Sequence, residues 1–188
     1  YFQYSNLGMA LLGEIVGAAS GVPYDSYIRQ RILEPLGMTD TTTDLPLRLA
    51  GGQLATGYTP LDRSGQRHEL ALFQTRAIAP AAGYASTVED LARFAAWQFS
   101  LLDSERDPTA GSSPRASILR PSTLREMHRV HRVDPELFAS EGSHWGLGFG
   151  IYQGDDQQIE GTYVGHGGAC PGFRTSLRLQ PDTKIAAI

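Results

Sequence analysis

The sequence has little cysteine, little charge and no long apolar run. A single cysteine in 188 residues excludes an internal disulfide framework and leaves the redox compartment undetermined. No apolar stretch approaches the roughly 18 residues that a membrane-spanning helix needs, so no transmembrane segment is expected. No basic stretch followed by an apolar one opens the chain, so no signal peptide is expected within it.

The charge balance is slightly acidic. Lys and Arg together number 16 and Asp and Glu number 20, which gives a net charge of −4. This balance offers no electrostatic reason to bind a polyphosphate, so no nucleic-acid partner is expected. Hydrophobic residues make up 41%, enough to bury a core, and the length predicts one domain or one lobe of a larger protein.

Both ends of the chain look cut. It begins at Tyr1 without an initiator Met, and it stops within the apolar run Lys184–Ile188, which no turn residue closes. We therefore expect an internal piece of a longer protein.

Two helices are predicted near the start of the chain. Leu7–Ala19 is apolar nearly all round, a pattern typical of a buried helix. Ser5 or Asn6 can cap its start, and Gly21 is expected to end it. A second helix is predicted over Tyr24–Leu33 from apolar residues at helical spacing.

The clearest helix is predicted further along the chain, over Ser86–Leu102. Ser86 and Glu89 form a capping box there, and the apolar residues that follow make one stripe. Another helix is predicted from Pro121 to about His131.

Two other stretches lack a regular pattern. Within residues 39–80, Thr56–Thr59 and Glu69–Phe73 are expected to pair across a turn at Asp62–Gly65. Residues 103–117 are polar, contain turn residues and predict an exposed loop. We expect both stretches to border a cleft.

Three strands are predicted after His144. They cover Leu147–Gln153, Gly161–Gly165 and Phe173–Gln180, with turn residues between them. In the third strand apolar and polar residues alternate, so one of its faces is expected to be buried.

This order of elements predicts an α/β fold in which a helical region packs beside part of an antiparallel sheet. The helical region, with irregular loops and a small hairpin, is expected over residues 1–143. The antiparallel strands are expected over 144–188, and the architecture looks incomplete at both ends.

Two short motifs contain residues suited to catalysis. Tyr4-Ser5-Asn6 comes directly before the first helix, and His166-Gly167-Gly168-Ala169 comes at the end of a strand. Taken alone, each motif has a structural interpretation as well. Tyr4 can be a core aromatic, Asn6 a helix cap, and His166 a turn histidine with a satisfied hydrogen bond.

Three further patterns in the sequence are weaker signals of function. Cys170 follows His166 by four residues, so it is either a nucleophile or, as we expect, a half-buried thiol. His128 and His131 have a spacing that suits a metal, yet no further ligands are evident, and a solvated helix face is favoured. Gly146-x-Gly148-x-Gly150 is flanked by strand signals, which argues against a nucleotide loop. Neither a metal nor a cofactor is expected.

The two motifs and the residues between them resemble the serine β-lactamase and penicillin-binding-protein superfamily. The nearest branch contains the class C β-lactamases, D-alanyl-D-alanine carboxypeptidases and esterases. Tyr4-Ser5-Asn6 matches its Y-x-N motif, and His166-Gly167-Gly168 matches the H-x-G variant of its K-T-G motif. The match continues over Ile32–Thr41, Ala82–Phe94 and His166–Phe173, and so spans nearly the whole chain.

The resemblance implies a fold and an activity. It implies a β-lactamase/transpeptidase-like fold and a serine hydrolase that cleaves an amide, ester or β-lactam bond through an acyl-enzyme. By resemblance, Tyr4 acts as base or proton shuttle and is held as a phenolate by His166 and by a lysine outside the chain. Asn6 would hydrogen-bond that lysine and the carbonyl of a small-molecule or peptide substrate.

The same resemblance gives roles to the residues after the histidine. The backbone N–H of Ala169 would be the second oxyanion donor. Gly167 and Gly168 lack side chains and would let the substrate approach the strand. The resemblance also favours a periplasmic or secreted location, with a cytoplasmic one left as an alternative, and it leaves the oligomeric state open.

One motif of the superfamily is missing. Its nucleophile belongs to S-x-x-K, but the only lysine is Lys184, and position 181 is a proline. We therefore expect the 188 residues alone to be inert. Two alternatives stay open: a catalytically silent, penicillin-binding-like domain that binds peptides or partners, and a small helical scaffold unrelated to this superfamily.

Overall fold

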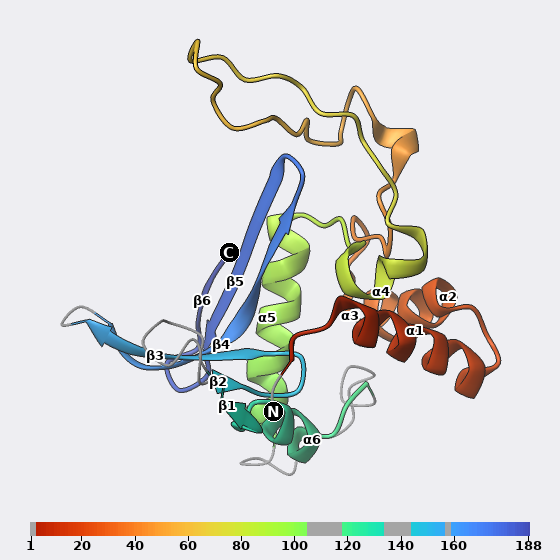
Figure 1. Ribbon diagram of the computed structural model, residues 1–188. Coiled ribbons are helices and arrows are strands. Elements are labelled where there is room, and N and C mark those ends of the chain that lie inside the picture. The colour runs from red at the N-terminus through yellow and green to blue at the C-terminus, as the bar shows by residue number, and fades with distance from the viewer. Residues whose placement is uncertain (1–2, 105–117, 134–143, 157–158) are drawn as a thin grey trace.

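The computed structural model describes residues 3–104, 118–133, 144–156 and 159–188. Helices come first and strands last, which confirms the predicted α/β class (Figure 1). The helices are α1 (Asn6–Ser20), α2 (Tyr24–Ile28), α3 (Glu34–Leu36), α4 (Ala79–Ala82), α5 (Val88–Asp103) and α6 (Pro121–Met127), with a π-helical turn at Arg29–Leu33 and 3₁₀ turns at Leu47–Leu49 and Arg76–Ile78. The strands are β1 (Arg132–Val133), β2 (His144–Trp145), β3 (Gly150–Asp156), β4 (Ile159–Cys170), β5 (Phe173–Gln180) and β6 (Ile185–Ala187).

The described strands form one antiparallel sheet in chain order, from β1 to β6. The strand predicted at Phe173–Gln180 is confirmed with the same bounds, whereas β4 is longer than predicted because its glycines stay within the strand. Pairing of β3 with β4 ends at Gly150 and Gly165. Pairing of β4 with β5 continues to Cys170 and Phe173.

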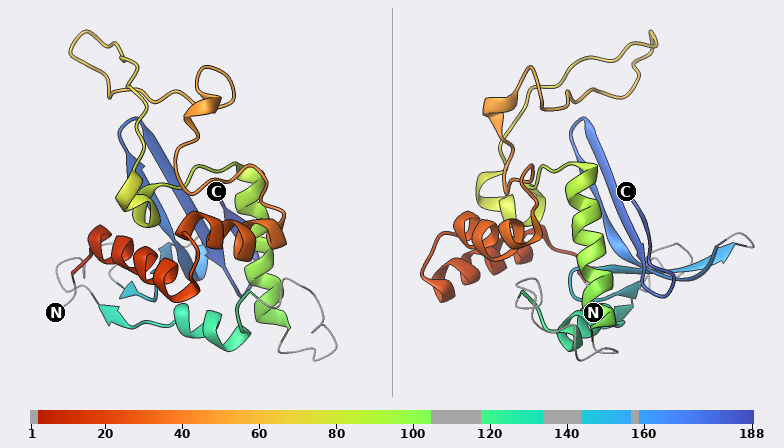
Figure 2. Two further views of the ribbon diagram at one scale, coloured as in Figure 1. Left: turned by 90° about the vertical axis from the view of Figure 1, so that its right-hand side faces the viewer. Right: turned by 180° about the vertical axis from the view of Figure 1, so that it is seen from behind.

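The core lies between the sheet and α5, which covers one face of it (Figures 1 and 2). Ala95 of α5 packs with Val164 and Leu179 of the sheet, and all three are buried. A second cluster joins α5 to α3 and α6 through Leu36, Leu101 and Leu124, of which Leu124 is 1% exposed. Burying an aliphatic side chain of this size contributes about 1.5–3 kcal/mol, so these clusters hold the helical region against the sheet.

The start of α5 differs from the predicted capping box. The N-cap is Thr87, whose hydroxyl accepts from the backbone N–H of Asp90 at 3.2 Å. Ser86 does not cap the helix because its Oγ is hydrogen-bonded to Oγ1 of Thr41 at 2.7 Å. Asp90 is fully buried and accepts from the Thr41 hydroxyl at 2.8 Å and from the backbone N–H of Asp40 at 2.9 Å. These contacts fix the start of α5 to the segment after α3.

The helix α1 has the predicted bounds within a residue, but the prediction that it is buried is wrong. Leu7, Leu11 and Ile15 are 67%, 55% and 59% exposed. Its buried side faces Pro80 just inside α4, so close that a Cβ on Gly13 would overlap that ring. When apolar residues lie on every side of a helix, the sequence does not indicate which side will be covered. The described residues cover only the side of α1 that faces Pro80.

Two other helices differ from their predictions. The helix that starts at Tyr24 passes Pro35 and ends at Gly37, whose φ is +71°. The helix α6 ends at Met127 instead of near His131. The loop predicted at 103–117 lies almost wholly outside the described residues. Within the described ranges no single helix is long and apolar enough to cross a membrane, although α1 and the helix at Tyr24–Leu36, bent by 78°, pass that test as a pair.

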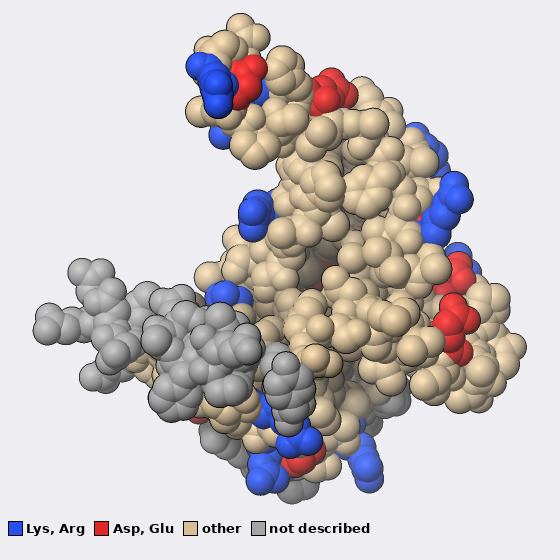
Figure 3. Space-filling view, viewed as in Figure 1, with Lys and Arg blue, Asp and Glu red and all other residues tan. Residues whose placement is uncertain are grey.

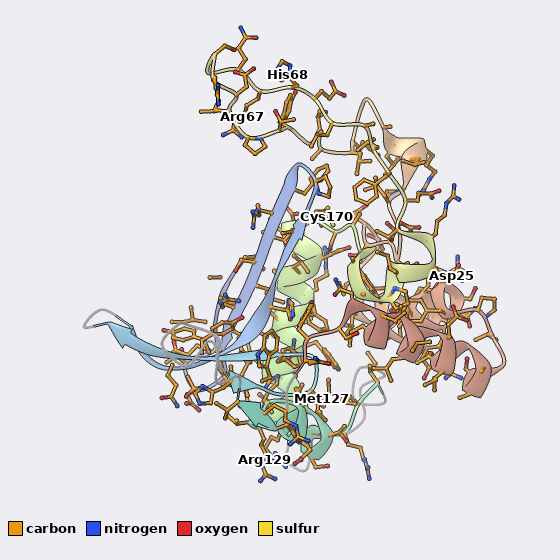
Figure 4. The ribbon with its side chains drawn as sticks, viewed as in Figure 1. Asp25, Arg67, His68, Met127, Arg129 and Cys170 are labelled. Atoms are coloured by element: carbon orange, nitrogen blue, oxygen red, sulfur yellow. The ribbon has the colours of Figure 1, made fainter. Side chains whose placement is uncertain are left out.

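Residues 45–75 leave the body as a projection, here called the arm (Figures 1 and 2). Its outer part is a hairpin, in which Tyr58 pairs with Glu69 and the Thr59 N–H donates to the His68 carbonyl at 2.9 Å. The Asp62 carboxylate closes the turn by accepting from Ser64, from the Gln66 N–H and from His68, and these hydrogen bonds hold its pKa below the usual range. The hairpin predicted here is confirmed. Figure 4 shows Arg67 and His68 toward its far end.

Candidate active site

The two sequence motifs meet in three dimensions. The rings of Tyr4 and His166 have centroids 6.0 Å apart. The ring of Trp145 lies beside both, with its centroid 5.7 Å from that of Tyr4 and 5.7 Å from that of His166. Three aromatic rings from the N-terminal segment, β2 and β4 thus form one cluster, here called the three-ring cluster.

Local structure explains why Tyr4 is available. Ser5 is the N-cap of α1, and its side chain accepts from the Gly8 N–H at 3.0 Å. Tyr4 therefore precedes the helix, is 56% exposed and reaches toward the sheet. Asn6 is the first helical residue and not the cap. It is exposed, and no hydrogen bond joins its side chain to another described residue.

His166 is half-buried, and its ring is oriented by its own strand. Nδ1 lies 2.5 Å from the carbonyl oxygen of Gly167. A carbonyl oxygen only accepts, so Nδ1 carries the proton in this arrangement and Nε2 is the nitrogen left for chemistry. Side chains alternate along a strand, so His166 lies on the same face as buried Val164, the face that α5 covers.

The backbone beside His166 has one open edge. Among the described strands, His166–Cys170 pairs only with β5, because β3 pairs no further than Gly165. A two-residue turn closes the β4–β5 hairpin at Cys170 and Phe173, and peptide groups alternate in direction along an antiparallel strand. Gly167 and Ala169 then direct their peptide groups to the open edge. The carbonyl of Gly167 accepts from the His166 side chain there.

Sequence reasoning missed Trp145. This residue is half-buried in β2 and stands opposite Gly150 of β3, which brings it next to the end of the β3–β4 pairing. The available signal was an aromatic residue directly before the Gly146-x-Gly148-x-Gly150 pattern. That pattern is a turn between strands, with φ of +80° at Gly148, and not a nucleotide loop.

The weaker candidates have structural roles. Cys170 ends β4, half-buried, and its Sγ contacts the carbonyl of Ala82 at 3.9 Å. Strand geometry separates it from His166 by about 13 Å, too far for a nucleophile–base pair. His128 Nε2 is hydrogen-bonded to Gln98 at 3.1 Å, and burial lowers the pKa of His128 to about 4. His131 bonds the Glu126 carbonyl at 2.8 Å, and no cluster of three metal-binding side chains occurs within the described ranges.

With this geometry established, comparison with known proteins identifies the family. The family described as Beta-lactamase matches residues 1–188. The chain belongs to the beta-lactamase family. This superfamily also includes the penicillin-binding proteins, and the sheet and helices described above have its fold.

Three individual members of the family illustrate how similar the chain is to them and how much of their length it covers. It is 27% identical to "Penicillin-binding protein 4" of Amycolatopsis lactamdurans, over 98% of this chain and 45% of that one. The octameric penicillin-binding protein homologue from Pyrococcus abyssi is 28% identical, with a TM-score of 0.76 over 99% of this chain and 37% of that one. The D-amino acid amidase from Ochrobactrum anthropi is 26% identical, with a TM-score of 0.70 over 99% and 48%. The chain therefore spans less than half the length of these relatives.

Proposed function

We propose that the whole protein is a serine hydrolase that cleaves an amide, ester or β-lactam bond through an acyl-enzyme. The observation that carries the proposal is the meeting of Tyr4 and His166, far apart in sequence, at 6.0 Å beside the open edge of β4. The family includes an amidase and penicillin-binding proteins, which supports acyl transfer as the reaction class. The nucleophile would be a serine of an S-x-x-K segment, since the 188 residues contain none.

Each residue then has a role that its position allows. Tyr4, exposed at the edge of the three-ring cluster, takes the proton of the serine hydroxyl. His166, whose Nε2 is not used by Gly167, either supplies positive charge or passes the proton on. The N–H of Ala169 on the open edge donates to the oxyanion that forms at the substrate carbonyl. Asn6, exposed at the start of α1, hydrogen-bonds the lysine of S-x-x-K and the substrate carbonyl.

The open edge also suits the shape of an acyl substrate. An unpaired strand offers a row of N–H and C=O groups to an extended ligand, as in strand addition. Gly167 and Gly168 add no side chains along this row. The substrate backbone can therefore approach closely enough for its carbonyl to reach the Ala169 N–H.

A fluorophosphonate probe tests the proposal. We expect stoichiometric labelling of the whole protein at a serine of S-x-x-K, located by mass spectrometry of the labelled peptide. The 188-residue chain alone is expected to stay unlabelled. Label on Ser5 or Cys170 would contradict this assignment of the nucleophile. A whole protein that binds peptides yet takes no label, and that lacks S-x-x-K, would instead be the catalytically silent binding domain.

A further inference from the structure

Few contacts hold the Tyr4 side chain in place. It precedes α1, is 56% exposed, and no hydrogen bond joins its hydroxyl to another described residue. Across the described ranges, its ring contacts are those with Trp145 and His166. A tyrosine side chain without a hydrogen bond turns between staggered rotamers, so the place of its hydroxyl depends on the rings packed against it.

Trp145, by contrast, lies on backbone that is fixed on both sides. It is paired with Arg132 of β1 on one side and with Gly150 of β3 on the other. Its carbonyl oxygen also accepts from the backbone N–H of His131 at 2.8 Å. The indole is half-buried, whereas Tyr4 is exposed. Of the two rings, Trp145 is therefore the fixed wall and Tyr4 the side chain that needs one.

The turn after Trp145 is attached to the end of α6. The N–H of Leu147 donates to the carbonyl oxygen of Met127 at 2.9 Å, and a Cβ on Gly146 would overlap that oxygen (Figure 4 shows Met127). The N–H of Gly146 donates to the carbonyl of Phe149 at 2.8 Å and closes the turn. Both the sheet and α6 thus hold the backbone that carries the indole.

The two contacts of Trp145 have the geometry of favourable ring pairs. Its centroid lies 5.7 Å from that of Tyr4 and 5.7 Å from that of His166, with interplanar angles of 49° and 54°. Aromatic pairs favour tilted arrangements at such separations over a face-to-face sandwich. Figure 3 shows mainly uncharged side chains between the sheet and α1, with Lys and Arg gathered lower down over α6. Ring packing is therefore the main contact that orders Tyr4.

We propose that Trp145 is a positioning residue for acylation: its indole holds the Tyr4 hydroxyl where it can take the proton of the serine. The inference rests on the proposed function, in which Tyr4 is the base. An indole N–H only donates, so Trp145 takes no proton itself and acts through Tyr4. A displacement of about 1 Å at a reacting group can cost about 10²-fold in rate, which sets the scale of the effect.

Substitutions at Trp145 in the whole protein test the proposal through kcat and KM for p-nitrophenyl butyrate. We expect Trp145→Ala to lower kcat by about 10- to 100-fold with little change in KM, because a misplaced base weakens the transition state and not substrate binding. Trp145→Phe keeps a ring and is expected to recover most of the loss. Leu147→Ala, two residues further along and 49% exposed, is the matched control and is expected to change nothing. An unchanged kcat in Trp145→Ala, or a change confined to KM, would overturn the proposal.

A double-mutant cycle separates positioning from support of the fold. If Trp145 acts through the Tyr4 hydroxyl, Trp145→Ala is expected to cost less than about threefold once Tyr4→Phe has removed that hydroxyl. An equal loss in both backgrounds would show that Trp145 acts through another group and would contradict the proposal. Circular dichroism checks that each variant is folded, and Trp145→Leu replaces Trp145→Ala in the cycle if the smaller side chain prevents folding.

Nitration by tetranitromethane tests the contact without catalysis. Nitration of Tyr4, located by mass spectrometry of its peptide, is expected to be at least about twofold faster in Trp145→Ala, because the ring loses its wall. Tyr58, 47% exposed on the arm, is the internal control and is expected to react at an unchanged rate. Unchanged nitration of Tyr4 would overturn the positioning role even if esters are hydrolysed. Faster nitration in a whole protein that takes no fluorophosphonate label would support the contact and leave only the proposed function refuted.

Discussion

Two histidines in this chain occupy opposite environments. His128 is packed edge-on against Phe149 at 4.7 Å between ring centroids, and its Nε2 is used by Gln98. His166 directs Nδ1 to its own backbone and stands beside an exposed tyrosine, with Nε2 bonded to no described residue. Both looked like candidate functional residues in the sequence. The difference shows that what a histidine can do depends on which nitrogen its surroundings leave available.

The largest effect on the reaction is expected at Tyr4, the exposed tyrosine that distinguishes the environment of His166 from that of His128. Tyr4→Phe keeps the ring contact with Trp145 and removes the hydroxyl, so the fold is expected to survive. Acylation of the whole protein, followed as kcat/KM or as the rate of fluorophosphonate labelling, is expected to slow by about 10²–10⁴-fold.

Tyr58→Phe is the matched control, since Tyr58 is 47% exposed on the arm and lies outside the cluster. It is expected to leave the rate unchanged. An unaltered rate in Tyr4→Phe would show that Tyr4 is only a structural aromatic, and the contrast between the two histidines would lose its catalytic meaning.

His128 is expected to affect stability and not the reaction. Burial lowers the pKa of His128 to about 4, below the value of about 6.5 for an unfolded chain. Between these values the unfolded state binds more protons, so stability falls as pH drops from about 6.5 toward 4 and is retained above 6.5. Allowing for partial exposure, this contribution is on the order of 2 kcal/mol.

Urea unfolding of the whole protein at pH 5 and pH 7.5 measures this contribution. His128→Gln is expected to flatten the dependence on pH, while His131→Gln, three residues away, is expected to keep it. The same pH dependence in His128→Gln and the unsubstituted protein would mean that another group causes the acid destabilisation.

His166, by contrast, is expected to shape the pH–rate profile. A neutral imidazole donates at one nitrogen and accepts at the other, whereas an ammonium group only donates, so His166→Lys changes which proton transfers position 166 allows. One limb of the kcat/KM profile between about pH 5 and 9 is expected to move or vanish, with a change of up to about tenfold per pH unit. The limb is alkaline if the charged form is needed and acidic if Nε2 must accept a proton. Superimposable profiles would exclude His166 from the proton transfers of the reaction.

The smallest expected effect is spectroscopic. Trp145 lies 5.7 Å from His166, whereas Trp97 packs with Phe94 in the core. A ring packed against an indole changes its fluorescence, so in a Trp97→Phe variant the remaining Trp145 emission is expected to change between acid and neutral pH through its neighbour His166. Adding His166→Gln should abolish the change, and adding His128→Gln should leave it. Persistence of the change without His166 would mean that another group affects the Trp145 emission and that His166 is not its cause.

Two helices show the limit of patterns in the sequence. In α5 a single apolar stripe (Val88, Leu91, Ala95, Phe99 and Leu102) indicates one buried side, and the structure agrees in part: Ala95 is buried, whereas Val88 at the start of the helix is 61% exposed. In α1 apolar residues surround the axis, so composition predicts burial on every side, and the structure covers only the side at Ala10 and Gly13. Apolar residues on one side of a helix indicate which side is buried, whereas apolar residues on every side do not.

The sequence by itself determined the α/β class, most helix starts, the hairpin of the arm and the last long strand, because capping, turn chemistry and alternation are local effects. It also contained both motifs. Only the tertiary structure decided that Tyr4 and His166 meet, that Trp145 joins them, and that β3 pairs with β4 no further than Gly165, with no other described strand beyond it on that side. These facts depend on where strands stop pairing and on which distant segments pack together. Such long-range contacts are set by the whole packed chain and leave no periodic signal in any one segment of it.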